Sequence, residues 1–320
     1  MKRQILTIAV FLAVAVPALP IPAHADDDDV TYSEWSSPES IGAPVNSVYL
    51  DIAPFVSRDE RSMYFFSDRP GGFGGNDIWV SERKKRSDPW GEPVNLGPTI
   101  NTEFNENAPT LSPDGRRLYF GSDRPGGFGG LDLYVSERRK RRQNLSWQAP
   151  ENLGSPVNTF ANEAAAAFFE DDGDGQSMMY FQSNRPGGIG LDDIFASPMN
   201  DDGSFGEPVL QLELSSPFLD RLPGIRRDGR EIFISSNRPG GFGFLDIWVA
   251  TREDAEDVWS TPVNLGGEIN SPGVDGRAML NRRGTRLYFH STRDPAQAFD
   301  IYTSSRKRID DDDCDDEDDD

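Results

Sequence analysis

The feature that most limits how this chain can fold is a repeat of 54–58 residues that occurs five times. Each unit opens with an aromatic residue, and these residues are Trp35, Trp90, Trp147, Phe205 and Trp259. A period of this length is typical of solenoids, propellers and arrays, in which every repeat is one supersecondary unit. The chain is therefore expected to contain five structural copies of one unit.

The unit that begins at Trp90 predicts four short strands, named A to D in chain order. Strands A, B and C are apolar or aromatic runs at residues 108–112, 118–122 and 132–137. Strand D opens the next unit, and the A–B turn Ser112–Gly115 has proline and glycine at favourable positions. Because four strands repeated radially are typical of propeller blades, we predict an all-β, five-bladed β-propeller with four antiparallel strands per blade.

The order of the strands also predicts how the ring closes. The chain starts on a D-type stretch at Trp35 and ends on a C-type strand at residues 300–304. The N-terminal stretch must therefore complete blade 5 by pairing antiparallel with that last strand. Such pairing joins the two chain ends and protects an otherwise open sheet edge.

Several motifs recur in the units. They are S-D-R-P-G-G-F-G-G at Ser67 and Ser122, S-N-R-P-G-G at Ser183 and Ser236, S-P-D-G at Ser112, D-I-W at Asp77 and Asp246, and V-N-L-G at Val94 and Val263. Over residues 35–308 the repeat resembles the WD-like propeller repeat of TolB-type periplasmic proteins and peptidoglycan-associated OmpA-type proteins. The resemblance implies an interaction platform in the cell envelope. The chain departs from TolB-type propellers, which usually have six blades, and blade 5 lacks the glycine-rich loop at residues 292–299.

The chain ends differ in composition from the repeats. Residues 1–25 have the features of a secretory signal peptide, with a basic start, a 12-residue apolar run and a small-x-small site before Asp26. That run is too short for a membrane-spanning helix, which needs about 20 residues. Residues 26–34 form an acidic N-terminal segment, and residues 310–320, with ten acids, are expected to be a disordered tail. We therefore predict a propeller at residues 35–309 in a periplasmic or secreted protein.

The net charge and the cysteine count bear on two questions: whether the protein binds nucleic acid, and whether a disulfide bond stabilises it. The formal net charge of −22 disfavours a nucleic-acid-binding protein. The single cysteine, Cys314, excludes an intramolecular disulfide. We predict a monomer without a transmembrane segment whose partner is an envelope protein or a glycan.

Each unit carries a carboxylate where its innermost strand is expected to begin. The residues, 15 or 16 positions after the opening aromatic residue, are Asp51, Glu106, Glu163, Asp220 and Asp275. They are expected to ring the end of the central channel at which the A strands start, here called the top. One interpretation is a ligand pocket or a cation site, for which calcium would be the natural ion. The other is that each carboxylate caps a backbone amide or pairs with an arginine of its own blade.

Two more charged positions occur in all five units. An arginine follows strand B in each, at Arg69, Arg124, Arg185, Arg238 and Arg293. An aspartate opens strand C, at Asp77, Asp132, Asp193, Asp246 and Asp300. Facing each other across one hairpin mouth, these residues are expected to form structural ion pairs.

Basic residues gather in the C–D loops of blades 1, 2 and 5, at the opposite, bottom end. This basic arc comprises Arg83, Lys84, Lys85, Arg86, Arg138, Arg139, Lys140, Arg141, Arg142, Arg306, Lys307 and Arg308. It would suit an anionic glycan, lipid headgroups or an acidic protein. The alternative is a solvated surface that the acidic tail neutralises, and we hypothesise that the tail folds back onto it.

Signals for catalysis are weak. After the signal peptide the only histidine is His290, which has no nucleophile-elbow context, and no zinc-binding motif occurs. Asp171, Asp172 and Asp174 resemble a calcium loop but lack its glutamate, which favours a polar insertion. Our leading hypothesis is a non-enzymatic binding scaffold that presents its top face to a protein or glycan and needs no cofactor. The alternative is a glycan-active enzyme of the five-bladed glycosidase type that uses the five inner-strand carboxylates.

Overall fold

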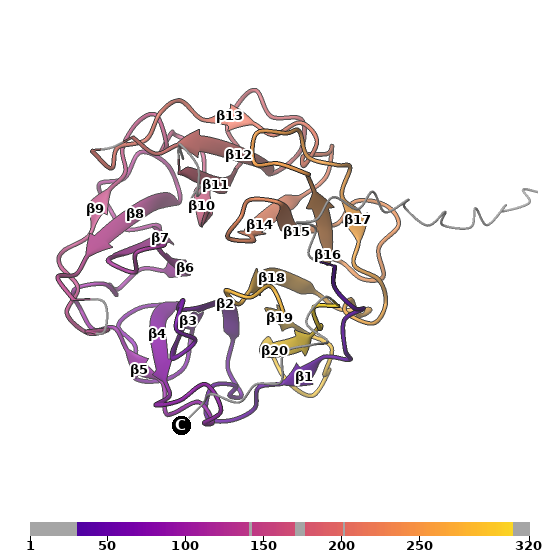
Figure 1. The fold of residues 1–320 in the computed structure, drawn as a ribbon. Coiled ribbons are helices and arrows are strands. Elements are labelled where there is room, and N and C mark those ends of the chain that lie inside the picture. The colour runs from indigo at the N-terminus through magenta and orange to yellow at the C-terminus, as the bar shows by residue number, and fades with distance from the viewer. Residues whose placement is uncertain (1–30, 141–142, 170–176, 201, 310–320) are drawn as a thin grey trace, which may run out of the picture.

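The structure is a computed structural model that describes residues 31–140, 143–169, 177–200 and 202–309. Within these ranges, five four-stranded antiparallel sheets stand around a central channel (Figure 1). The predicted five-bladed, all-β propeller is therefore confirmed. The predicted signal peptide, the acidic tail, Arg141, Arg142 and the aspartates at 171, 172 and 174 lie outside the described residues.

The strands of each blade run from the channel outward in the order A to D. Blade 1 holds β2 (Asp51–Val56), β3 (Ser62–Ser67), β4 (Asp77–Glu82) and β5 (Val94–Asn95). Blade 2 holds β6 (Glu106–Leu111), β7 (Arg117–Ser122), β8 (Asp132–Glu137) and β9 (Glu151–Asn152). Blade 3 holds β10 (Glu163–Phe169), β11 (Met178–Ser183), β12 (Asp193–Pro198) and β13 (Val209–Leu210). Blade 4 holds β14 (Asp220–Ile225), β15 (Glu231–Ser236), β16 (Asp246–Thr251) and β17 (Val263–Asn264). Blade 5 holds β18 (Asp275–Leu280), β19 (Arg286–Ser291), β20 (Asp300–Ser305) and, from the other chain end, β1 (Glu39–Ser40).

Blade 5 is closed as the strand order predicts. β1 pairs antiparallel with β20, with Glu39 opposite Thr303, and the two strands lie side by side in Figure 1. The pairing extends beyond β1, because the amide of Ser36 donates to the carbonyl oxygen of Ser305 at 2.8 Å. The first described strand therefore covers the edge of the last one.

The spaces between blades are filled by apolar side chains. Phe55, Tyr64 and Ile78 of blade 1 share one buried cluster with Leu118 and Phe120 of blade 2. Fully burying such side chains stabilises a fold by roughly 1.5–3 kcal/mol each. Apolar packing between neighbouring blades therefore stabilises the ring.

The innermost strand of every blade contains a β-bulge. Its pairing register shifts after the second residue, and its third residue has a positive φ of 48–59°. The five bulge residues are Ala53, Ala108, Ala165, Leu222 and Arg277. A bulge bends its strand and re-aims a side chain, so these five positions differ in direction from their neighbours. Four of them are aliphatic, and only blade 5 has a charged residue there.

Candidate functional site

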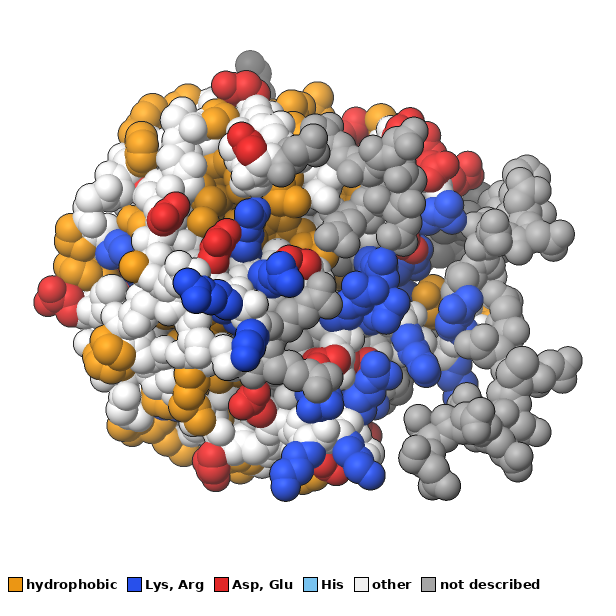
Figure 2. Space-filling model, turned by 60° about the vertical axis from the view of Figure 1, so that its left-hand side comes forward, with side chains coloured by type: hydrophobic (Ala, Val, Ile, Leu, Met, Phe, Trp, Pro, Cys, Tyr) orange, Lys and Arg blue, Asp and Glu red, His pale blue; other side chains and the backbone are white. Residues whose placement is uncertain are grey.

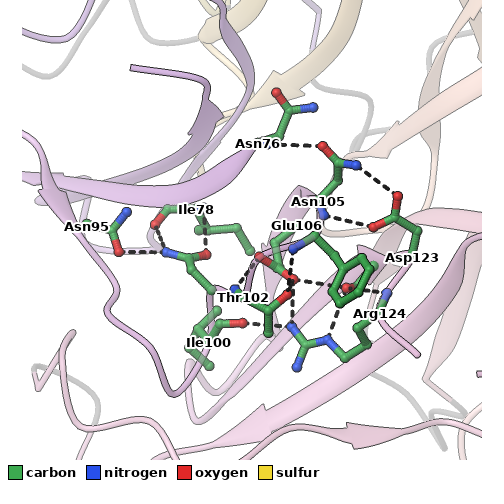
Figure 3. A network of polar contacts seen from close by, with 12 residues as sticks. Asn76, Ile78, Asn95, Ile100, Thr102, Asn105, Glu106, Asp123 and Arg124 are labelled. Carbon is green, nitrogen blue, oxygen red and sulfur yellow. Dashed lines mark hydrogen bonds and ion pairs between the residues drawn. The ribbon is translucent and has the colours of Figure 1, made fainter. Parts of the chain in front are cut away.

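The five top carboxylates lie at the first position of β2, β6, β10, β14 and β18, where the sequence predicts them. All five are completely buried. Glu106 shows how one of them is held (Figure 3). Its carboxylate accepts hydrogen bonds from the amide and hydroxyl of Thr102, at 2.8 and 2.7 Å, and from the hydroxyl of Ser122 at 3.0 Å. The hydrogen-bonding capacity of this carboxylate is therefore used by groups of its own blade.

Every one of these carboxylates also pairs with the arginine that follows strand B of its blade. The pairs are Arg69–Asp51 at 2.5 Å, Arg124–Glu106 at 3.0 Å, Arg185–Glu163 at 3.3 Å, Arg238–Asp220 at 2.5 Å and Arg293–Asp275 at 2.9 Å. Each guanidinium also stacks over aromatic side chains of its blade. Buried charges at the top are therefore neutralised pair by pair.

These pairs correct the prediction that the same arginines bind the aspartates of strand C. Asp132 instead accepts hydrogen bonds from the amides of Phe128 and Gly129, at 2.5 and 3.0 Å. A Cβ atom at Gly127 would lie 2.1 Å from Oδ2 of Asp132, which explains why the loop needs glycine there. Asp77, Asp193 and Asp246 accept the corresponding loop amides. The R-P-G-G motif is thus a carboxylate-binding hairpin loop.

Blade 5 has the aspartate without this loop. In the described structure Oδ1 of Asp300 has no hydrogen-bond partner. Burial, together with the neighbouring carboxylates of Asp51 and Asp294, raises the pKa of Asp300 to about 6. In blades 1 and 3 burial also raises the pKa of Asp77 and Asp193, and Oδ1 of Asp77 likewise has no partner among the described residues, but amides of the glycine-rich loop lower the pKa in part. Blade 5 lacks those loop amides.

At the top end, the five inner-strand carboxylates do not form an open site. Among the described residues, no three histidine, cysteine, aspartate or glutamate side chains lie close enough together to hold a metal ion. The five carboxylates are also enclosed, and a catalytic acid or base has to reach its substrate. The chemistry of this protein must therefore be sought elsewhere in the channel.

A cavity of about 410 Å³ opens at the bottom end, where the inner strands pass into the A–B turns. Phe55, Phe168 and Phe169 supply aromatic surface, and Ser112 and Asn281 supply polar groups. The charged residues among those described in its wall are six arginines and two aspartates, namely Arg58, Arg86, Arg138, Arg227, Arg277, Arg282, Asp59 and Asp114. The cavity is therefore predominantly cationic within the described part of the chain.

The two aspartates of the cavity wall come from equivalent A–B turns. Oδ1 of Asp114 accepts hydrogen bonds from the hydroxyl of Ser112 at 2.6 Å and the amide of Arg116 at 2.9 Å. Asp59 accepts the same pair of bonds in blade 1, at 2.8 and 3.2 Å. Each turn thus fixes its aspartate at the mouth of the channel.

Arg277 lines this cavity and crosses the channel. From the bulge of β18 its guanidinium donates to the carbonyl oxygens of Pro223 at 3.3 Å and Ala166 at 3.1 Å, and to the hydroxyl of Thr110. It therefore binds the inner strands of blades 4, 3 and 2. Its side chain is almost completely buried. Burial lowers its pKa to about 10, which leaves the group charged at neutral pH.

His290, on the second strand of blade 5, is another buried titratable group. It packs edge-on against Phe299 with ring centroids 5.5 Å apart, and its Nδ1 atom has no partner among the described residues. Burial and the charge of Arg277 lower the pKa of His290 to about 3. The imidazole is therefore neutral at physiological pH.

The basic arc is only partly a free surface. Arg83, Arg138 and Arg306 each donate from Nε to a carbonyl oxygen of the A–B turn in their own blade, at 2.7–2.9 Å. Each also stacks over the tryptophan that precedes strand D of its blade, 4.2–4.5 Å from the ring centroid. These three arginines therefore hold loops in place. Lys84, Lys85, Arg86, Arg139, Lys140 and Lys307 are exposed, and Figure 2 shows basic side chains gathering on one part of the surface.

No family model matches the sequence, and no curated protein matches it either. Solved structures do match. An α-L-arabinofuranosidase from Lactobacillus brevis has a TM-score of 0.57 and 18% identity, with 82% of this chain and 92% of that one covered. The catalytic domain of a GH62 α-L-arabinofuranosidase from Coprinopsis cinerea has a TM-score of 0.60 and 11% identity, with 86% and 97% covered. At identities this low, the structural matches establish a shared fold.

The comparison corrects the leading hypothesis from the sequence. The propeller glycosidases favour the alternative, a glycan-active enzyme, and the prediction of a non-enzymatic scaffold is wrong on this finding. A structure described as TolB from Agrobacterium tumefaciens reaches a TM-score of only 0.47 at 16% identity, with 87% of this chain and 86% of that one covered, too distant to support the TolB-type resemblance. In the described ranges no helix has the length and apolar character needed to cross a membrane.

Proposed function

We propose that this chain is a glycan-active enzyme that binds its substrate in the bottom cavity of the channel. The observation that carries the proposal is the cavity itself, in which aromatic and polar side chains from several blades converge. Its volume of about 410 Å³ falls within the range of small-molecule sites, which are mostly apolar with a few placed polar groups. Matching structures of the same fold are arabinofuranosidases, which supports a sugar substrate.

The carboxylates that serve this activity are Asp59 and Asp114. Most glycosidases use a pair of carboxyl groups, one as acid and the other as base or nucleophile. The five inner-strand carboxylates are excluded from that role because each is enclosed and ion-paired in its own blade. Asp59 and Asp114 are the two carboxylates in the described cavity wall, and they come from neighbouring blades.

The experiment is a hydrolysis screen in which the purified protein is incubated with arabinan, arabinoxylan and acidic polysaccharides. Release of reducing sugar is measured for the wild type and for Asp59→Asn and Asp114→Asn. Asparagine can also form the turn that aspartate forms, so these variants should fold while losing at least about 100-fold in rate, the usual size of a general acid–base contribution.

Asp228→Asn is the matched control. Asp228 holds the equivalent turn of blade 4, accepting from the amide of Arg230 at 3.0 Å, but it is not part of the cavity wall. This variant should keep the wild-type rate. The proposal fails if the wild type hydrolyses none of the polysaccharides, or if all three variants behave alike.

Export to the periplasm and kinship with TolB-type propellers stay predictions. N-terminal sequencing of the exported protein tests the first, because cleavage before Asp26 is expected.

A further inference from the structure

We infer that the glycan bound in the bottom cavity carries a carboxylate, as an acidic sugar does, and that Arg277 is the residue that recognises it. The inference rests on the proposed function, since it specifies the substrate class of the same site. At the bulge of its inner strand, blade 5 has a charged residue where the other four blades have an aliphatic one.

Arg277 occupies the bulge position that holds Ala53, Ala108, Ala165 and Leu222 in blades 1 to 4. A small aliphatic side chain is therefore sufficient for the bulge. Because the bulge re-aims its side chain, the arginine reaches across the channel to three other blades instead of pairing within its own sheet. The bulge alone does not require an arginine here.

The surroundings of Arg277 leave its charge without a counter-charge. The acceptors it binds are two carbonyl oxygens and one hydroxyl, all neutral, and the described structure has no carboxylate ion-paired with it. By contrast, each of the five top arginines has a buried carboxylate within 3.3 Å. A buried charge is costly unless it is paired. An anionic ligand in the cavity would offset that cost.

Most other charged side chains in the described cavity wall are also positive. Arg58, Arg86, Arg138, Arg227 and Arg282 line the cavity with Arg277, against two aspartates. A cleft lined by one sign of charge raises the local concentration of the opposite sign. The neighbouring His290 stays neutral because burial and Arg277 lower its pKa. At the base of the cavity the charge is therefore that of Arg277, whose planar fork suits a carboxylate.

A purely structural role is the competing explanation, since Arg277 bridges three blades. The two roles differ in what they predict for ligand choice. Trigalacturonate and its fully methyl-esterified form have the same sugar chain, but only the first carries carboxylates. A structural arginine affects the binding of both ligands alike, whereas a recognition residue discriminates between them.

Isothermal titration with these two ligands tests the inference on the intact protein. The wild type should bind the free acid at least about tenfold more tightly than the ester, the difference that 1.4 kcal/mol of preference produces. Arg277→Met should remove the preference and keep the affinity for the ester. Arg277→Lys retains the positive charge but loses the planar guanidinium, so it should keep part of the preference for the free acid. Lys84→Met removes a charge from an exposed loop outside the cavity and should behave as wild type.

The outcomes separate the two levels of the proposal. If neutral arabinan or xylan fragments bind in preference to the acid, or if Arg277→Met keeps the tenfold preference, the inference is overturned while a glycan site stands. If neither acidic nor neutral oligosaccharides bind to the wild type, the proposed function fails with it. Should Arg277→Met not fold, the acid-to-ester ratios of the wild type and of Arg277→Lys decide the question.

Discussion

The two ends of the central channel treat buried charge in opposite ways. At the top, five carboxylates and five arginines form five buried pairs, one in each blade. At the bottom, Arg277 of blade 5 crosses the channel, and its hydrogen-bond acceptors within the described part of the chain are all neutral. Both ends are built from the same inner strands, and in β18 Arg277 follows the top carboxylate Asp275 by only two residues.

The difference shows how a repeat protein separates structure from function. A pair that recurs in every blade satisfies a need that every blade has, which here is to anchor the start of the inner strand. A charge that occurs in one blade only cannot serve that common need. In this propeller the repeated polar residues stabilise the fold, and the departure from the repeat marks the candidate site.

The largest effect is expected when one top pair is broken. Glu106→Gln leaves Arg124 buried beside a neutral amide, and losing one member of a buried pair costs about 3–5 kcal/mol. The free energy of unfolding, measured by urea denaturation, should fall by that amount. A loss below about 1 kcal/mol would mean that the top pairs behave like surface ion pairs, and the contrast between the ends would disappear.

Removing the charge at the bottom should have the opposite sign. Arg277→Met keeps much of the side-chain volume and eliminates a buried charge that has no carboxylate partner among the described residues. Because the desolvation cost outweighs the three neutral hydrogen bonds, the free energy of unfolding should rise by about 1 kcal/mol. The same urea titration measures it. A fall as large as that of Glu106→Gln would assign Arg277 to the scaffold.

A smaller, pH-dependent effect is expected at Asp300, the strand-C aspartate of the blade that lacks the glycine-rich loop. The folded-state pKa of Asp300, about 6, lies above its ordinary value of 3.8, so the folded protein binds a proton that the unfolded chain has released. Stability should therefore fall as the pH rises from about 4 to about 6. Asp300→Asn should match the wild type near pH 4 and be the more stable protein above pH 7.

Thermal denaturation from pH 4 to pH 8 measures this difference. Asp132→Asn is the matched control in blade 2, where the aspartate is held by two loop amides. It loses charge-assisted hydrogen bonds and should be less stable than the wild type at pH 7. Parallel curves for Asp300→Asn and the wild type would show that Asp300 is not strained by its charge.

The sequence predicts the blades, the closure and the position of the top carboxylates because all three follow from a fixed period and from strand order. The pairing of the arginines is different. Ser122 stands opposite both Glu106 and Asp132 in the sheet, so spacing alone does not tell which carboxylate Arg124 binds. The loop amides decide it, since they satisfy Asp132 and leave Glu106 to the arginine.

The bottom cavity could not be predicted in the same way. A bulge inserts a residue and breaks the alternation from which the facing of a side chain is read. Arg277 therefore looks like one polar residue in an irregular strand. A signal was present in the alignment of the five units, where three alanines and a leucine stand opposite this arginine. The burial of Arg277 and its contacts with three other blades arise only when the five blades close into a ring, so they cannot be read from the sequence of one unit.

A crystal structure of the protein with trigalacturonate tests the contrast between the two ends most directly. We expect sugar density in the bottom cavity, with a carboxylate within hydrogen-bond distance of Arg277 and the five top pairs unchanged. Density at the top, beside Glu106 and its counterparts, with the bottom cavity lacking sugar, would contradict it.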